Sequence, residues 1–243
     1  IYQELVKINL AIENHQLDKN PVLLKAFLYA KENKKKLHFM GLLSDGCIHS
    51  SEKHLYRLIE LAEENGVPEF FVHAFTDGRD TDPKSGIGFL KTLQERLNGT
   101  NGRLASVVGR YYAMDRDKRW ERVKIAYDAL VNRVGDVTND LFSAITSSYE
   151  KNVTDEFLLP IINADTPASG IKDGDTVICF NFRTDRCREI TEVLTQTAFP
   201  EYQMKPVQLN YTTMTMYSHA FKNIHVIFEK DDLVNTLGGI LSQ

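Results

Sequence analysis

Cysteine is scarce in this sequence of 243 residues, and its spacing excludes two common kinds of site. Only Cys47, Cys179 and Cys187 occur, and no two of them form a Cys-x-x-Cys pair. An odd number of widely spaced cysteines argues against a disulfide framework and against a zinc site built from thiolates. We therefore expect a protein of a reducing compartment, the cytoplasm.

Long apolar runs and a strong excess of one charge are missing as well. The longest uninterrupted apolar runs are short, whereas a membrane-spanning helix needs about 20 residues. Lysine and arginine number 29 against 33 aspartates and glutamates, which leaves a net charge of −4. Since a nucleic-acid-binding domain usually carries a basic surface, we expect neither nucleic acid nor membrane as a partner. A cationic binding site must then be local.

What the sequence does contain is apolar segments that alternate with helical patterns. Helix starts are indicated by Ser50 or Ser51 as N-cap of one helix, and by Asp82 followed by Pro83 at the next. The candidate strands are residues 37–44, 69–75, 104–109, 176–182, 207–217 and 224–229. The first four are almost continuously apolar, which is typical of strands buried on both faces. The pattern predicts an α/β fold of three layers, with a mixed, mainly parallel sheet and helices on both faces.

Each of the first four predicted strands is followed by a polar cluster. The clusters read SDGCIHS, TDGRDTDP, RYYAMDRDKR and RTDRCRE along the chain. Because ligands bind at the carboxyl ends of the strands in an open parallel sheet, we expect the four loops to share one cleft.

Five arginines in these loops indicate what the cleft binds. They are Arg79, Arg110, Arg116, Arg183 and Arg186. A guanidinium grips carboxylate or phosphate through two parallel hydrogen bonds, which the ammonium of lysine cannot do. Thr184 or Asp185 is expected to cap a helix that places Arg186 in its first turn, where backbone N–H groups also favour an anion. The predicted ligand is a small molecule with more than one anionic group.

Structural explanations compete at several of these positions. Neighbouring charges could simply pair with one another in a salt-bridge network, as Asp115, Arg116, Asp117 and Arg119 would. Asp77 and Gly78 are explained by a tight turn. The turn does not explain Asp80. A carboxylate among arginines should stay ionised and could exchange a proton with a substrate hydroxyl.

The histidines give weaker signals. His49 lies near Asp45, but two ligands are too few for a metal site. His73 lies inside an apolar strand and is predicted to be a core histidine with its hydrogen bonds satisfied.

Four segments together resemble one family. LLSDGCIHS, HAFTDGRDTDP, GRYYAMDRDKRWERV and NFRTDRCREI are similar, in order and spacing, to segments of the cofactor-independent phosphoglycerate mutases. Members of that family have an alkaline-phosphatase-like domain with two manganese ions and a serine nucleophile, and an inserted domain that holds the glycerate. This chain resembles the inserted domain only. The resemblance implies that residues 11–230 form that domain and that residues 1–10 and 231–243 are hinge segments leading to the other one.

The resemblance also implies which residues contact substrate. They are His49, Arg79, Asp80, Arg110, Arg116, Arg183 and Arg186, with Asp80 as the catalytic residue that handles the hydroxyl proton. Phosphate would pass from 3-phosphoglycerate to the serine and return to give 2-phosphoglycerate, a step of glycolysis and gluconeogenesis that needs no 2,3-bisphosphoglycerate. The serine, the manganese ligands and a substrate-binding lysine would belong to the other domain. We therefore expect that this chain alone binds no metal and has no activity. We also expect the parent enzyme to be a monomer. Cys47 departs from the family, which commonly has glycine there.

Two other classes of function remain open at this point. One is a stand-alone module that binds an anionic metabolite without chemistry, which predicts a gene product with no metal-binding domain. The other is an RNA or nucleotide binder that stacks bases on Tyr111, Tyr112 and Trp120, which predicts strongly salt-dependent binding of oligonucleotides.

Overall fold

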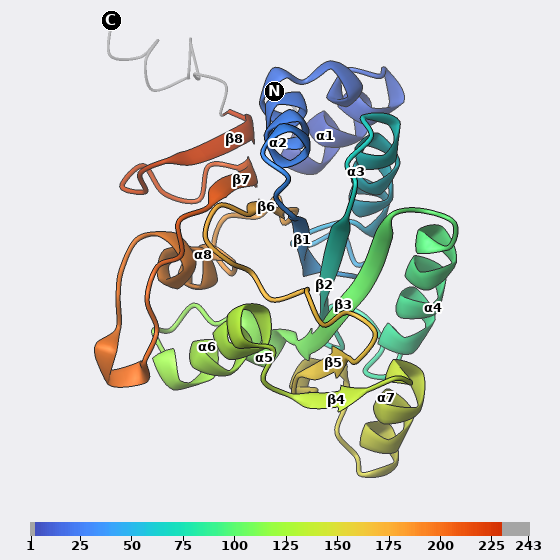
Figure 1. Ribbon diagram of the computed structural model, residues 1–243. Coiled ribbons are helices and arrows are strands. Elements are labelled where there is room, and N and C mark those ends of the chain that lie inside the picture. The colour runs from blue at the N-terminus through green and yellow to red at the C-terminus, as the bar shows by residue number, and fades with distance from the viewer. Residues whose placement is uncertain (1–2, 230–243) are drawn as a thin grey trace, which may run out of the picture.

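The apolar segments of the sequence form the strands of one sheet in the computed structural model, which describes residues 3–229 (Figure 1). The sheet has eight strands in the order β4-β5-β3-β2-β1-β6-β7-β8. Every neighbouring pair is parallel except β3 with β5. The strands are β1 Leu37–Leu42, β2 Phe70–Thr76, β3 Gly102–Gly109, β4 Asp136–Thr138, β5 Ile161–Asn163, β6 Thr176–Cys179, β7 Asn210–Thr215 and β8 Ile224–Phe228.

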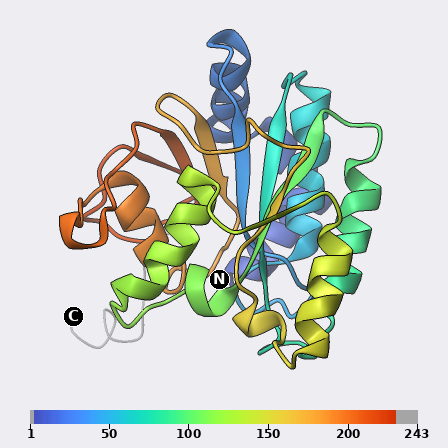
Figure 2. The ribbon, with the colours of Figure 1, turned by 60° about the horizontal axis from the view of Figure 1, so that its bottom comes forward.

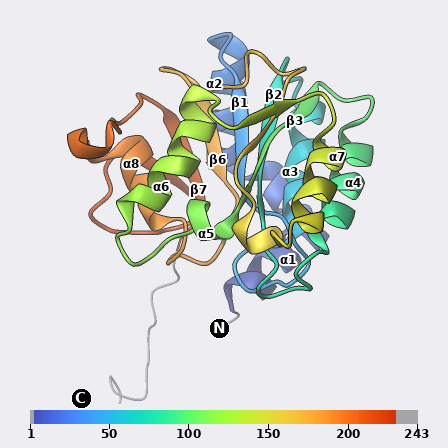
Figure 3. The same ribbon diagram turned by 90° about the horizontal axis from the view of Figure 1, so that it is seen from below.

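Helices cover both faces of this sheet (Figures 2 and 3). The α-helices are α1 Glu4–Glu13, α2 Pro21–Glu32, α3 Glu52–Glu64, α4 Gly86–Leu97, α5 Arg110–Ala113, α6 Trp120–Tyr127, α7 Leu141–Glu150 and α8 Arg188–Thr195. A π-helical turn, η2 Asp128–Asn132, continues α6, and the 3-10 turns are η1 Leu17–Lys19, η3 Asp155–Phe157 and η4 Pro200–Tyr202. None of the helices in residues 3–229 is long and apolar enough to cross a membrane.

Two apolar cores separate the three layers. One core packs α1, α2, α3, α4 and α7 against one face of the sheet, and the other packs α5, α6 and α8 against the opposite face. Every residue of β1 and β2 is buried, as a central strand covered on both faces requires. The predicted fold class is confirmed.

The sequence pattern located the long strands but missed two short ones. The predicted strand at 207–217 is shorter, Asn210–Thr215, and β4 and β5 were not expected at all. Each of the two has three residues, and Val137 of β4 is exposed. Such short segments at one end of a sheet carry neither an apolar run nor a clear alternation.

Two predicted helix starts are wrong. The side chain of Asp82 accepts a hydrogen bond from the Lys84 N–H and forms a local turn, and α4 begins later, at Gly86. Its first N–H is capped from elsewhere, by the Asp155 carboxylate at 2.7 Å. Helix α8 begins at Arg188 and not at Asp185, because residues 184–187 form a turn. Arg186 therefore precedes the helix. Ser51 is the N-cap of α3, as expected, although its side chain makes no capping bond.

A chain of buried polar side chains crosses the sheet at mid-strand. His73 Nδ1 forms a hydrogen bond with Ser106 Oγ at 2.8 Å. His73 Nε2 forms a second one with His38 Nδ1 at 3.1 Å. His38 Nε2 in turn lies 3.4 Å from Asp175 Oδ2. The prediction that His73 is a satisfied core histidine is confirmed.

The predicted hinge segments stay predictions. Residues 4–10 lie in α1, which continues to Glu13. Residues 231–243, the second predicted hinge segment, lie outside the described part of the chain.

Candidate functional site

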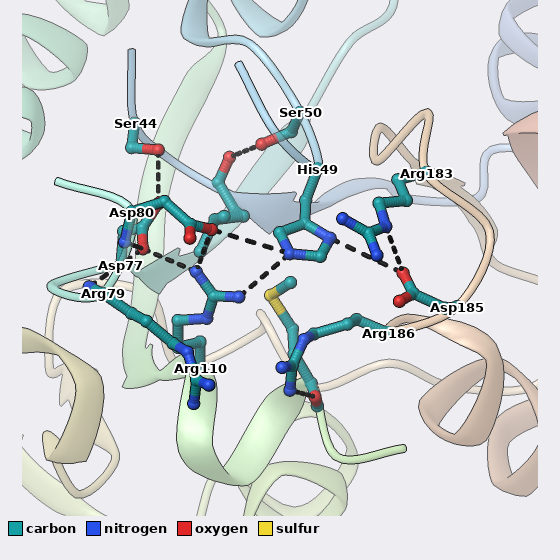
Figure 4. Close-up of polar contacts among 12 residues, drawn as sticks. Ser44, His49, Ser50, Asp77, Arg79, Asp80, Arg110, Arg183, Asp185 and Arg186 are labelled. Atoms are coloured by element: carbon teal, nitrogen blue, oxygen red, sulfur yellow. Dashed lines mark hydrogen bonds and ion pairs between the residues drawn. The ribbon is translucent and has the colours of Figure 1, made fainter. Parts of the chain in front are cut away.

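The four polar loops meet at the carboxyl edge of the sheet, as predicted (Figure 4). They follow β1, β2, β3 and β6, which are adjacent in the sheet. Contacts join all four, because Arg110 after β3 reaches Asp77 and Asp80 after β2 and His49 after β1, and Arg116 reaches Asp185 after β6. Backbone bonds from Phe182 N and Arg183 N to His49 O also tie the first loop to the fourth.

Arg110 lies at the centre of the site. It directly follows β3 and is only 2% exposed. One terminal nitrogen, Nη1, lies 2.6 Å from Asp77 Oδ1 and 2.6 Å from Asp80 Oδ2, while Nη2 donates to His49 Nε2 at 3.0 Å. Burial opposes the charge of Arg110, but the two carboxylates outweigh it and raise the pKa of the guanidinium. A buried cation held by two carboxylates fixes the position of each.

Asp77 anchors the loop that carries Arg79 and Asp80. Its Oδ1 accepts the N–H groups of both residues, at 3.2 and 2.9 Å, and its Oδ2 accepts from Ser44 Oγ at 2.8 Å. Burial by itself would raise the pKa of Asp77, yet these hydrogen bonds and Arg110 lower it. The expected turn at Gly78 is confirmed by its φ of +68°, and a Cβ there would come within 2.8 Å of Asp155 Cβ.

His49 is buried and neutral. Burial and the Arg110 cation lower its pKa to about 4. Since the guanidinium can only donate, Nε2 accepts and the ring proton belongs on Nδ1. Nε2 also lies 3.6 Å from Asp80 Oδ2, and Nδ1 lies 3.6 Å from Asp185 Oδ1.

Asp185 pairs with two half-exposed arginines. Its Oδ2 accepts from Arg116 Nη1 at 3.1 Å, and its Oδ1 lies 3.1 Å from Arg183 Nε. Burial would raise the pKa of Asp185, but Arg183, His49 and Arg116 together lower it. The carboxylate is therefore ionised at neutral pH.

Arg79 and Arg186 are held more loosely. Among the described residues the Arg79 side chain pairs only with Glu156, Nη1 to Oε1 at 3.4 Å, and it is 55% exposed. Arg186 donates to the Met114 carbonyl at 3.2 Å and makes no ion pair within residues 3–229. Burial and the neighbouring Arg110, Arg116 and Arg79 lower the pKa of Arg186, which shows that positive charge is in excess around it.

A cleft of about 320 Å³ opens between the loops after β2, β3 and β6 and the η3 turn, whereas the loop after β1, also expected to share the cleft, does not line it. Four of the five arginines line it, together with Tyr111, Glu156 and Phe157; the four are Arg79, Arg110, Arg116 and Arg186. Arg183 and His49 lie beside it, joined through Asp185. A larger hollow of about 520 Å³ lies at the amino ends of β7 and β8, but it contains Lys222 and no arginine. The arginine cleft is therefore the better anion site.

No group of three or more histidine, cysteine, aspartate or glutamate side chains within residues 3–229 could hold a metal ion. His49, the histidine beside the cleft, has the Arg110 cation on one nitrogen, which disfavours a metal there. The residues of this site do not fit manganese.

All seven predicted substrate residues lie at this edge of the sheet, but one competing explanation is wrong. Arg116 pairs with Asp185 and not with its sequence neighbours, while Asp115 faces Arg122 at 3.6 Å and accepts the N–H groups of Asp117 and Arg119. The sequence interpretation missed the roles of three carboxylates, Asp77, Asp185 and Glu156. The first two were read as a turn residue and a helix cap, and Glu156 is far from the four clusters in sequence.

Comparison with known proteins identifies relatives of the whole chain. A family model described as "BPG-independent PGAM N-terminus" matches residues 8–219. The 2,3-bisphosphoglycerate-independent phosphoglycerate mutase of Bacteroides fragilis is 52% identical over 243 residues, which are all of this chain and 48% of that protein. The enzyme of the same name from Clostridium novyi is 44% identical over 246 residues, again 48% of its length.

A solved structure shares the fold. Phosphoglycerate mutase of Leishmania mexicana, crystallised at low cobalt concentration, superposes with a TM-score of 0.78 at 32% sequence identity, over 88% of this chain and 42% of that one. The chain thus spans about half the length of the curated relatives it matches. Because the family model covers most of its length and these relatives match it throughout, the chain belongs to the BPG-independent PGAM N-terminus family.

Proposed function

We propose that this chain is the substrate-holding part of a phosphoglycerate mutase that interconverts 3-phosphoglycerate and 2-phosphoglycerate. The observation that carries the proposal is the arginine cleft. One buried arginine, Arg110, fixes Asp80 and His49, while Arg79, Arg116 and Arg186 line the cleft and Arg183 lies beside it. Phosphoglycerate carries a carboxylate and a phosphate, and such groups take paired hydrogen bonds from guanidinium.

In this proposal the buried arginine and the other four arginines have different roles. Arg79, Arg116, Arg183 and Arg186 bind the carboxylate and phosphate of the ligand. The first three are about half exposed, and Arg186 has no carboxylate partner in the described part of the chain. Arg110 is already occupied by Asp77 and Asp80 and therefore contacts the ligand mainly through Nη2 and the groups it holds.

Asp80 is the proposed catalytic residue. Its Oδ2 accepts from Arg110 and lies 3.6 Å from His49 Nε2, while its side chain remains partly exposed. A carboxylate within reach of a bound hydroxyl can take up and return its proton.

The serine nucleophile and the metal ions are proposed to lie in the remainder of the parent protein. The cleft within residues 3–229 has no metal-binding group, and the metal would supply charge stabilisation for the phosphate outside this part of the chain. We further propose a monomeric parent in a reducing cytoplasm, in line with three free cysteines. Trp120 packs on Phe199, with ring centroids 4.2 Å apart, which does not favour a base-stacking surface.

The test is turnover of 3-phosphoglycerate by the parent polypeptide with Asp80→Asn and, separately, Arg183→Lys. We expect Asp80→Asn to lower kcat by about 100-fold or more, because general acid–base groups contribute roughly 10²–10⁴-fold. Arg183→Lys should raise KM by about tenfold or more, the worth of one charged hydrogen bond. Arg96→Lys is the control, since Arg96 lies over the Tyr56 ring and pairs with Glu60 away from the cleft. Wild-type activity in both test variants would contradict the proposal.

A further inference from the structure

A carboxylate of the protein itself already lies between two arginines of the cleft. Asp185 contacts Arg116 Nη1 at 3.1 Å and Arg183 Nε at 3.1 Å. Both arginine side chains are 46% exposed, so a ligand from solvent can reach them. Asp185 therefore occupies the kind of position that an anionic group of a ligand would take.

The same carboxylate faces an unused donor. Asp185 Oδ1 and His49 Nδ1 are both buried and have no hydrogen-bond partner within residues 3–229. They lie 3.6 Å apart, which is slightly too far for a hydrogen bond. Because Arg110 donates to Nε2, the ring carries its proton on Nδ1, pointing toward Asp185.

If an anion binds Arg116 and Arg183, Asp185 loses its ion pairs with both arginines. A partly buried carboxylate without a donor is costly, and His49 Nδ1–H, a buried donor with no partner within residues 3–229, lies 3.6 Å from Asp185 Oδ1. A small movement of the side chain would make that bond. Figure 4 shows His49 between Asp185 on one side and Arg110 with Asp80 on the other.

We propose that Asp185 is a positioning residue that changes partners when ligand binds. In the free site it holds Arg116 and Arg183 as an internal substitute for the ligand anion, and after displacement it accepts a hydrogen bond from His49 Nδ1–H. The new bond fixes the His49 ring and, through Nε2 and Arg110, the carboxylate of Asp80. The inference rests on the proposed function, because the displacing ligand is taken to be a phosphorylated carboxylate.

The test is nuclear magnetic resonance of the chain with 15N-labelled histidine, titrated with 3-phosphoglycerate and, separately, with inorganic phosphate. In the wild type, 3-phosphoglycerate should move the His49 Nδ1–H proton signal downfield as the bond to Asp185 forms. Asp185→Asn keeps the side-chain shape and removes the competing charge, so both anions should bind several-fold more tightly. The ligand-dependent shift of His49 should be largely lost in that variant.

Asp18→Asn is the matched control. Asp18 likewise bridges an arginine and a histidine, Arg57 Nε at 3.0 Å and His15 Nδ1 at 2.8 Å, but outside the cleft. It should leave both anion affinities and the His49 signal unchanged.

The possible outcomes separate the two proposals. Binding of 3-phosphoglycerate to the wild type with no change at His49, or weaker binding to Asp185→Asn, would overturn the partner exchange and leave the substrate assignment standing. No binding of either anion by the wild type would overturn both.

Discussion

At the scale of single residues, the structure distinguishes five arginines that look equivalent in the sequence. Arg110 is almost fully buried and bridges two carboxylates and a histidine, whereas Arg79, Arg116 and Arg183 are about half exposed. Sequence position predicted that the five would gather, because each follows a buried strand. It could not predict which one is buried, since that depends on Asp77 and Ser44 from other loops.

Removing the Arg110 charge should destabilise the fold as well as the site. Arg110→Met leaves Asp77 buried without its cation, and breaking a buried ion pair costs about 3–5 kcal/mol. Urea denaturation should show a loss of roughly that size in the unfolding free energy. Arg96→Met, which removes an exposed pair with Glu60, should cost about 0–1 kcal/mol. Equal losses in the two variants would mean that the Arg110 network contributes nothing to stability.

At the scale of elements, tertiary contacts decide where the helices beside the site begin. Helix α4 starts at Gly86 because Asp155, 69 residues away, caps it. Helix α8 starts at Arg188, and Glu189 in its first turn accepts the Lys118 N–H at 2.9 Å and thereby holds the loop of Arg116. Local capping rules predicted both helices but placed the starts too early, because α4 is capped by a residue distant in sequence and residues 184–187 before α8 form a turn.

Glu189 gives α8 a distinctive pH dependence. Burial, with the neighbouring Asp115, raises the pKa of Glu189 to about 7. A raised pKa in the folded state means that its contribution to stability is complete below the ordinary pKa and is lost as pH rises through about 7. The side chain of the Glu189→Gln variant cannot ionise. As the pH rises from 5 to 8, the unfolding free energy of the variant should therefore increase relative to that of the wild type by about 1–3 kcal/mol.

Denaturation by urea at the two pH values measures this difference. Glu121→Gln is the control, because Glu121 is exposed on the neighbouring α6. If the difference between Glu189→Gln and the wild type is the same at both pH values, Glu189 is ionised throughout and the assignment of its pKa is wrong.

At the scale of the whole molecule, the alternation of apolar runs and helical patterns was enough to predict three layers and a mainly parallel sheet. The central strands are buried on both faces and so carry the strongest signal. The edge strand β4 and its neighbour β5 carry almost none, and the antiparallel pairing of β3 with β5 could not be foreseen. Cys47 has a φ of +53°, a conformation that glycine would adopt without strain.

The same organisation explains why the site could be predicted as a region and not in its internal contacts. Parallel strands bring their carboxyl ends to one edge, so the loops of His49, Arg79, Arg110 and Arg183 had to meet. Pairings such as Asp185 with Arg116, or Glu156 with Arg79, join residues about 70 or more positions apart. No local pattern specifies them.

The central claim, that the arginine cleft is a phosphoglycerate site, is tested most directly by calorimetric titration of this chain with 3-phosphoglycerate. Arg183→Lys and the control Arg96→Lys are titrated in parallel. We predict binding that weakens about tenfold or more in Arg183→Lys, the worth of one charged hydrogen bond, and that stays unchanged in Arg96→Lys. Absence of binding, or equal binding by wild type and Arg183→Lys, would contradict the account.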